Sequence, residues 1–317
     1  MPAPAIIRVM PYDLHMHSTA SDGTDAPGDL ARLVKDAGLA GFALTDHDTT
    51  SGLADAAAAA KRLRLKFVPG IELSADPGSI APPEAGGVAS DTPGVGTLHI
   101  LGYHVRHDDA GLARLGERLR ATRAKRNPEV VEKLQQLGVK IEYDEVLAAA
   151  GVPESAWGDA AAIDATGVIV GRPHIAQVLI AKGYVRSIHE AFAKYIGFGG
   201  AAHTRKDRLS AAEAIAAIHA AGGAAVLAHP VQLRLAEDLL EHAVARLADL
   251  GLDGIETRHS DHGPGDTEQF TDYAERFGLV TTGGSDYHGS RKHVALGSVT
   301  VTGEDAERLE AAAARHG

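Results

Sequence analysis

This chain of 317 residues has the composition of a folded globular protein, with 44% hydrophobic and 23% charged residues, which excludes a disordered chain. Its formal net charge of −11 and its 4% of aromatic residues argue against binding of long nucleic acid. No apolar run approaches the roughly 20 residues that cross a bilayer, and the first residues lack the apolar segment of a signal peptide. We therefore expect a cytoplasmic protein without a membrane partner. Because there is no cysteine, a metal site must use His, Asp and Glu, and 17 histidines are many for this length.

The first strand is expected over 12–17, where apolar and polar residues alternate. Side chains of a strand alternate between its two faces, so His15 and His17 point the same way. Asp22 follows in the next loop. Imidazole and carboxylate groups are ligands for Zn, Mn, Fe and Mg, but a His-x-His pair alone is weak evidence. Whether these residues form a metal site depends on further metal-capable residues later in the chain.

Helical and strand patterns then alternate, with helices expected over 26–38 and 51–63 and strands over 41–45, 65–71 and 97–101. His47 follows the second of these strands within Asp46-His47-Asp48, and Glu72 ends the next one. A carboxylate at the end of an apolar strand is costly to bury unless it is paired or bound to metal. His99 lies in the strand after a long Gly- and Pro-rich segment, 74–96, that predicts a surface loop.

The pattern changes to mostly helical over 105–200, which predicts an insertion that caps the barrel mouth. Basic residues are concentrated over 114–126, a run that by default is a solvated helix face. The motif Gly171-Arg172-Pro173-His174 precedes a helix expected over 175–183. The chain is thus divided into 1–104 and 201–317, which form the barrel, and 105–200, which forms the cap.

The barrel pattern returns after the insertion, with helices expected over 210–221, 234–250 and 266–277 and strands over 224–228, 252–256 and 279–283. His229 follows the first of these strands, and His259 and His262 lie in a polar loop after the second. Asp286 and His288 follow the last strand with the same one-apart spacing as His15 and His17.

Nine metal-capable residues are therefore expected at or just past the carboxyl ends of parallel strands: His15, His17, Asp22, His47, Glu72, His99, His229, Asp286 and His288. In α/β barrels the active site lies on that face. Nine such groups exceed the needs of one ion, so two or three ions fit better. Clustered divalent ions clamp phosphoryl groups and generate hydroxide near neutral pH.

The order of these motifs resembles the PHP (polymerase and histidinol phosphatase) superfamily: His-x-His, Asp-His-Asp, Gly-Ile-Glu, His-Ile-Leu-Gly-Tyr, Ala-His-Pro and Ser-Asp-x-His. The resemblance covers essentially the whole chain. It implies an α/β fold, a distorted (βα)7 barrel with a helical cap, and two or three divalent ions, with Mn preferred over Fe, Zn, Co or Mg.

The resemblance also implies how the ligands are shared. His15, His17, Glu72 and Asp286 would hold the first ion; Glu72, His99 and His229 the second; and Asp22, His47 and His288 the third. A metal-bridging hydroxide, held over Glu72, Asp286, His229 and His288, would attack phosphorus.

The insertion with Gly-Arg-Pro-His resembles the branch of 3′,5′-nucleoside bisphosphate phosphatases and 5′→3′ exonucleases that act on short RNA. It implies that the substrate contacts are made by Arg172, His174, Arg123 or Arg126, His203 and His259. The expected reaction is removal of the 3′-phosphate from adenosine 3′,5′-bisphosphate or a similar nucleotide. His203, His259 and Asp48 are the candidates for the general acid.

Four other functions remain open from the sequence. The same site could cleave short 5′-phosphorylated oligonucleotides, or it could hydrolyse histidinol phosphate, although the insertion weighs against the second. An amidohydrolase barrel also begins with His-x-His, but usually places a lysine where this chain has Glu72. A non-catalytic metal-binding domain is the last alternative. The sequence does not indicate an oligomeric state.

Overall fold

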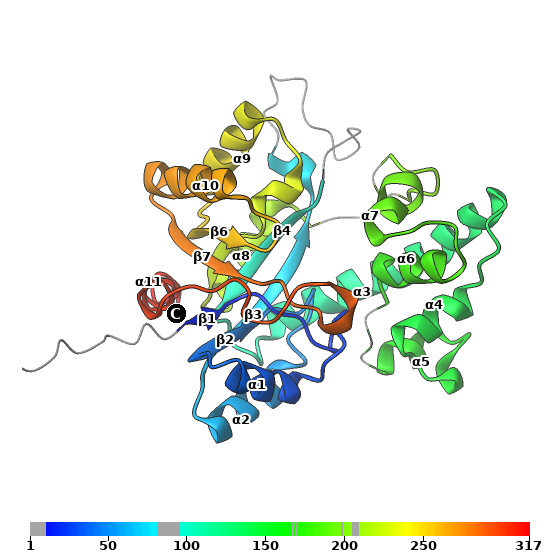
Figure 1. Ribbon diagram of the computed structural model, residues 1–317, viewed down its shortest axis with the longest axis horizontal. Helices are drawn as coiled ribbons and strands as arrows, with labels where there is room; N and C mark the ends of the chain where they lie inside the picture. The colour runs from blue at the N-terminus through cyan, green and yellow to red at the C-terminus, as the bar shows by residue number, and fades with distance from the viewer. Residues whose placement is uncertain (1–10, 81–95, 167, 169, 198, 205–208) are drawn as a thin grey trace, which may run out of the picture.

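Seven strands form one sheet in the order in which they occur in the chain (Figure 1). The structure is a computed structural model that describes residues 11–80, 96–166, 168, 170–197, 199–204 and 209–317. The strands are β1 (Tyr12–Asp13), β2 (Gly41–Leu44), β3 (Lys66–Ala75), β4 (Leu98–Tyr103), β5 (Ala224–Leu227), β6 (Gly254–His259) and β7 (Val280–Gly284). The expected α/β barrel is confirmed.

The sheet is nearly closed by contacts between its first and last strands. The amide of Leu14 donates to the carbonyl of Gly283 at 3.3 Å, and the amide of His17 donates to that of Tyr287 at 2.9 Å. The close approach requires glycine at position 284, because a Cβ there would lie 2.3 Å from the backbone nitrogen of His15. Closure of the sheet therefore brings the segment that carries His15 and His17 next to the segment that carries His288.

The strand β4 runs antiparallel to both β3 and β5, which corrects the expectation of uniformly parallel strands. His99 therefore lies near the start of its strand, and Glu72 lies within β3, which continues to Ala75 by pairing with β4. Because β4 is reversed, its beginning lies at the edge where its parallel neighbours end. The segment expected as a loop over 74–96 begins with this strand and a 3₁₀ turn, Pro77–Ile80; residues 81–95 lie outside the described part.

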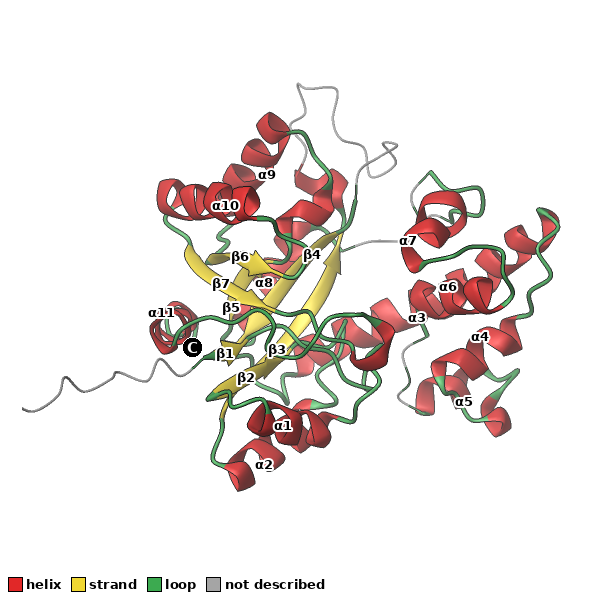
Figure 2. Ribbon diagram, in the orientation of Figure 1, coloured by secondary structure: helices red, strands yellow, loops and turns green. Residues whose placement is uncertain are grey.

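Helices cover the outer face of the sheet (Figure 2). They are α1 (Pro27–Asp36), α2 (Leu53–Leu63), α8 (Ala211–Ala220), α9 (Glu237–Asp249), α10 (Pro264–Phe277) and α11 (Gly303–Ala313). Their apolar stripes, for example Leu30 and Val34 of α1, are buried against the sheet. Sequence analysis did not anticipate α11, although Thr302 and Asp305 form a capping box at its start.

The segment inserted between β4 and α8 is helical and has a core of its own. Its helices are α3 (Ala110–Gln136), α4 (Tyr143–Ala150), α5 (Ala160–Ala165), α6 (Arg172–Ala181) and α7 (Ile188–Ala191). The long helix α3 joins the two cores: Leu112 and Leu119 pack in the barrel core, whereas Val130 and Leu134 pack in the core of the insertion. In Figure 1 the insertion and α11 lie on opposite sides of the barrel. No helix within the described ranges is long and apolar enough to cross a membrane.

A buried hydroxyl ties β4 to the segment that carries the first histidines. The hydroxyl of Tyr103 donates to the carbonyl of Leu14 at 2.9 Å, and both side chains are fully buried. In Tyr103→Phe this carbonyl loses its partner, so we expect the free energy of unfolding to fall by about 1–3 kcal/mol. Urea denaturation of the metal-free protein measures the change. The control is Tyr12→Phe, whose hydroxyl makes no hydrogen bond within the described residues; equal stability of the two variants would contradict the assignment.

Candidate metal centre

All nine metal-capable residues singled out in the sequence lie in one cluster in the structure. Their ligand atoms form overlapping groups, each within 4.8 Å, that include His17 with Asp22, His47 and His288, and His47 with Glu72 and His99. Seven of the nine residues are buried, with Glu72 only 1% exposed, and the other two, His47 and His99, are partly exposed. The cluster is therefore shielded from bulk water on most sides.

Glu72 lies at the centre of the cluster. Its Oε1 is 2.7 Å from Nδ1 of His99 and 2.9 Å from Nε2 of His229. Its Oε2 faces three further imidazoles, at 3.0 Å from His47, 3.2 Å from His17 and 3.5 Å from His15. One carboxylate thus touches five histidines: two that follow β1, one that follows β2, one in β4 and one that follows β5.

Two more carboxylates complete the cluster. Oδ1 of Asp286 lies 3.3 Å from His17, 3.4 Å from His288 and 3.5 Å from His15. Oδ1 of Asp22 lies 3.2 Å from Nε2 of His288. The arrangement places carboxylate oxygens between imidazole nitrogens from separate strands, as a multinuclear metal site requires.

The donor set fits divalent cations. Six buried ring nitrogens or carboxylate oxygens in this region have no hydrogen-bond partner within the described residues: Nε2 of His15, Nε2 of His17, Nδ1 of His47, Oε2 of Glu72, Nδ1 of His229 and Nε2 of His259. Unpaired buried polar atoms are costly, and a coordinated cation would satisfy them. Nitrogen and oxygen donors without sulfur suit Mn, Fe, Zn, Co or Mg.

The carboxylates divide the histidines into two protonation classes. Burial lowers the pKa of His17, but the carboxylates of Asp286 and Glu72, 3.3 and 3.2 Å from its Nε2, outweigh it and raise the pKa to about 9. Against the same burial, the charges of Glu256, Asp286 and Glu72 raise the pKa of His15. Burial lowers the pKa of His229 and of His288 to about 4. In the metal-free protein at pH 7, His15 and His17 are therefore protonated, whereas His229 and His288 are neutral.

Unusual backbone conformations occur at two residues of the cluster, His229 and Asp286, and at the buried Asp48. Asp48, His229 and Asp286 have φ values of 53°, 26° and 57°, in the left-handed region that most side chains avoid. Each of these residues follows the end of a strand, where the chain turns sharply. Such conformations persist where the surrounding structure and a functional side chain require them.

Sequence analysis assigned no role to two buried carboxylates beside the cluster, Glu256 and Asp46. Glu256 Oε1 accepts a hydrogen bond from Nδ1 of His15 at 3.1 Å, and its Oε2 accepts one from the amide of His229 at 2.7 Å. Asp46 accepts from the amide and hydroxyl of Ser18. The repetition of Gly-Ile-Glu at 70–72 and 254–256 was the signal that could have identified Glu256. Carboxylates in this position fix the tautomer and orientation of metal-binding histidines.

The six residues expected to contact substrate do not all lie in one place in the structure. His259 is buried beside the cluster, with Nε2 3.3 Å from Oδ2 of Asp286. His174, buried at the start of α6, contacts Arg291, which follows His288 in the chain. Arg172 donates to the carbonyl of Ile196 at 3.3 Å.

The other three substrate candidates lie in the insertion or beside it. The guanidinium of Arg126 is buried against the side chain of Asn127. The backbone carbonyl of His203 accepts a hydrogen bond from Lys133. The side chain of Arg123 lies outside the described part of the chain. Among the candidate acids, Asp48 is buried and accepts a hydrogen bond from the amide of Ser74 at 2.9 Å.

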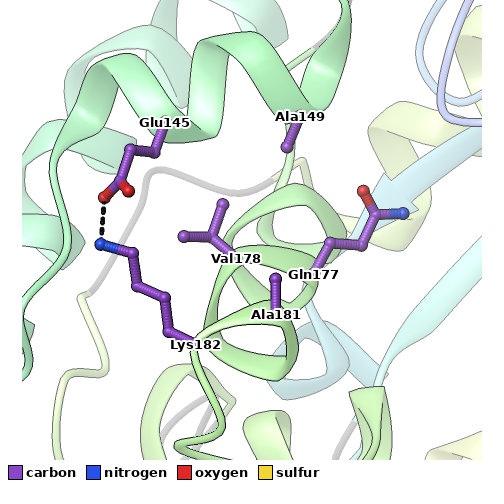
Figure 3. A pocket seen from close by; sticks show the side chains of 6 residues that line it. All are labelled: Glu145, Ala149, Gln177, Val178, Ala181 and Lys182. Atoms are coloured by element: carbon purple, nitrogen blue, oxygen red, sulfur yellow. Dashed lines mark ion pairs between the residues drawn. The ribbon is translucent and has the colours of Figure 1, made fainter.

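A hollow of about 400 Å³ lies between α4 and α6 of the insertion, away from the metal-capable cluster. Figure 3 shows Lys182 paired with Glu145 across it, at 2.6 Å, with Val178 and Ala181 below. The one carboxylate and the one amine that line this hollow are paired with each other, unlike the carboxylates and imidazoles of the metal-capable cluster.

Comparison with known proteins supports this assignment. The family described as "PHP domain" matches residues 13–250. A "5'-3' exoribonuclease" of Haemophilus influenzae is 30% identical over 277 residues, which are 87% of this chain and 89% of that protein. A "3',5'-nucleoside bisphosphate phosphatase" of Chromobacterium violaceum is 30% identical over 276 residues, which are 87% of this chain and 86% of that protein. The crystal structure of a candidate metal-dependent phosphoesterase from Bifidobacterium adolescentis has a TM-score of 0.75 and 31% identity, covering 95% of this chain and 96% of that one.

The central position of Glu72 leads to a graded test of metal binding. In Glu72→Gln a charge shared by five imidazoles is lost, so we expect metal affinity to fall by more than the roughly 10–100-fold that follows loss of an outer partner. Glu256→Gln is the matched variant, because Glu256 contacts His15 on the opposite ring nitrogen and should show only that smaller loss. Metal content after dialysis at fixed free Mn²⁺ measures both. Equal metal content in the two variants would show that Glu72 is not a ligand.

The raised pKa values of His15 and His17 predict proton release on metal binding. Both rings must lose a proton before they bind a cation, so titration of chelator-treated protein with Mn²⁺ at pH 7 should release about two protons. Calorimetry in buffers of different ionisation enthalpy counts them. The number should fall as the pH rises through about 9, the pKa of His17, because this ring is then already neutral. A heat that does not depend on the buffer would contradict the prediction.

Proposed function

Because the chain belongs to the PHP domain family of metal-dependent phosphoesterases, we propose that it removes the 3′-phosphate from nucleoside 3′,5′-bisphosphates. The proposal includes three divalent ions, preferably Mn²⁺, held by the nine clustered residues, with Glu72 shared between two of them. It also treats residues 105–200 as a cap carried by a barrel of 1–104 and 201–317.

The observation that supports the choice of substrate is a contact between the insertion and the loop that leads away from the cluster. Through His174, helix α6 touches the loop that follows His288. A substrate bound at the cluster would therefore meet donors from the insertion as well. A small nucleotide with a second phosphate uses both surfaces, whereas a simple phosphomonoester uses only the first. The similarity to a bisphosphate phosphatase over most of both chains points the same way.

Ions in this cluster would supply Lewis-acid stabilisation of charge on the phosphoryl oxygens and a hydroxide nucleophile near neutral pH. The chain's own contribution is to fix the orientation of the rings that would bind the ions. Nδ1 of His15 donates to Glu256, and Nδ1 of His288 donates to the carbonyl of Asp286 at 2.8 Å. In both rings Nε2 then faces the carboxylates of the cluster, so the ligand atoms are aligned before the ions arrive.

Cleavage of short 5′-phosphorylated oligonucleotides is a second candidate function. The observation that favours it is the similarity to an exoribonuclease, which matches that to the phosphatase in identity and coverage. The two reactions use the same attack on phosphorus and differ in the leaving group. They differ also in how much space the substrate needs beyond the cluster, so direct comparison of substrates separates them.

The deciding experiment measures phosphate release from adenosine 3′,5′-bisphosphate with Mn²⁺, beside cleavage of a 5′-phosphorylated dinucleotide. We expect AMP and phosphate from the first and at least about tenfold lower kcat/KM for the second. Faster cleavage of the dinucleotide would assign the exonuclease function instead. Inactivity towards both by protein with confirmed metal content would overturn the proposal.

A substitution at Asp286 tests whether this activity depends on the cluster. In Asp286→Ala one carboxylate oxygen facing three histidines is lost, and we expect kcat/KM to fall by at least about 100-fold. The control is Asp272→Ala, since Asp272 is exposed on α10 and pairs only with Arg276 among the described residues. Activity of Asp286→Ala close to that of the control would remove Asp286 from the site.

A further inference from the structure

Asp22 is the only one of the nine clustered residues in the loop 18–25, the Asp22 loop, which lies between β1 and α1. One of its oxygens forms a group with a ring nitrogen of His17, of His47 and of His288, and these four atoms all lie within 4.8 Å of one another. The three histidines follow three different strands, β1, β2 and β7. Whether the four atoms can hold one ion therefore depends on what keeps the Asp22 loop in place.

The buried carboxylate of Asp46 holds one side of the Asp22 loop. Its Oδ1 accepts hydrogen bonds from the amide of Ser18 at 2.8 Å and from the hydroxyl of Ser21 at 2.5 Å. Its Oδ2 accepts one from the hydroxyl of Ser18 at 2.7 Å. Because Asp46 directly precedes His47, these bonds tie the loop that carries Asp22 to the segment that carries His47.

The side chain of Tyr287 holds the other side of the Asp22 loop. Tyr287 lies between Asp286 and His288 in the chain, and its hydroxyl donates a hydrogen bond to Oδ2 of Asp25 at 3.0 Å. Burial and the nearby carboxylate of Asp25 raise the pKa of Tyr287 to about 12, so the phenol keeps its proton at neutral pH and remains a donor. Asp22 and His288, whose Oδ1 and Nε2 lie 3.2 Å apart, are thus also linked by a hydrogen bond outside the cluster.

The same two segments also approach closely beside this hydrogen bond. The amide of Ser290 donates to Oγ1 of Thr24 at 3.0 Å. Gly289 has a φ of 67°, and a Cβ there would collide with Oγ1 of Thr24 and with the carboxylate of Asp25. Glycine therefore allows the contact. Figure 1 shows the blue segment that follows β1 beside the orange segment that follows β7.

These contacts order the Asp22 loop through the protein alone. A loop that becomes ordered only when it binds an ion loses conformational entropy in that step, which weakens binding. Three hydrogen bonds to Asp46 and two to residues 287 and 290 already order this loop. In contrast, His99 lies in β4 and His229 follows β5, so neither is carried by the two segments. Loosening the loop should therefore affect the ion at Asp22 most.

We propose that Tyr287 and Asp25 are positioning residues for a single ion of the cluster, whose affinity they set separately from that of the other ions. This ion is the one that the group of four would hold: His17, Asp22, His47 and His288. Tyr287 and Asp25 would not touch the ion and would act through the position of Asp22 relative to His288. That the cluster holds more than one ion is part of the function proposed above, on which this inference rests.

The test measures the affinity of each ion without substrate. In Tyr287→Phe the hydrogen bond to Asp25 is lost, and we expect the Kd of one Mn²⁺ ion to rise about 10-fold, the lower end of the effect of losing an outer partner of a metal ligand. The other ions should bind as in the wild type. Calorimetric titration of chelator-treated protein with Mn²⁺, together with metal content after dialysis, gives the number of ions and the Kd of each.

Two substitutions of Asp25 test whether the hydrogen bond itself matters. Asp25→Asn keeps an oxygen that can accept from the phenol of Tyr287 and should preserve the binding of all ions, whereas Asp25→Ala should lose the same ion as Tyr287→Phe. The control is Tyr184→Phe, because the hydroxyl of Tyr184 accepts from the amide of Lys140 within the insertion. This variant should bind every ion like the wild type.

The outcomes separate this inference from the proposed function. If adenosine 3′,5′-bisphosphate is not hydrolysed but one ion is selectively weakened in Tyr287→Phe and Asp25→Ala, the function fails and the positioning role stands. Equal weakening of every ion in these two variants would show a general loss of structure and would overturn the positioning role. Unchanged binding of every ion in both variants would overturn it as well.

Discussion

The carboxylate of Glu72 is the interaction on which the site depends. It is buried and lies between 2.7 and 3.5 Å from imidazole nitrogens of five histidines. A buried carboxylate requires compensating positive charge. In the metal-free protein the protons of His15 and His17 supply it, as their raised pKa values show. Cations bound in the same place would replace those protons, which is why metal binding and protonation are coupled here.

The barrel makes this arrangement possible because it joins segments distant in sequence. Closure of β1 against the last strand brings His15 next to Asp286. His99 lies at the beginning of the reversed strand β4, opposite Ser74 of β3, and its ring reaches Glu72 two residues along that strand, at 2.7 Å. Left-handed backbone at His229 and Asp286 then turns these side chains inward. The cost of such conformations is carried by the extensive packing of the barrel core.

The insertion is joined to the barrel at two places. Helix α3 is packed in both cores, so the insertion is held to the barrel by a continuous helix rather than by a loop alone. At its other end, α6 presents His174 to Arg291. Side chains from two parts of the chain therefore meet at the loop that follows His288.

The sequence by itself determined the barrel class, the helical insertion and the nine residues that gather in the cluster, because spacing along strands and the residue types of metal ligands are local properties. It missed helix α11, the orienting role of Glu256 and the contact between Arg291 and His174. It also assigned the wrong direction to β4. Only the tertiary structure decided these points, since strand direction and contacts between residues 117 positions apart depend on the path of the whole chain. Local sequence patterns indicate which residues are able to bind a metal ion, and the packing of the whole chain determines which of these residues come into contact.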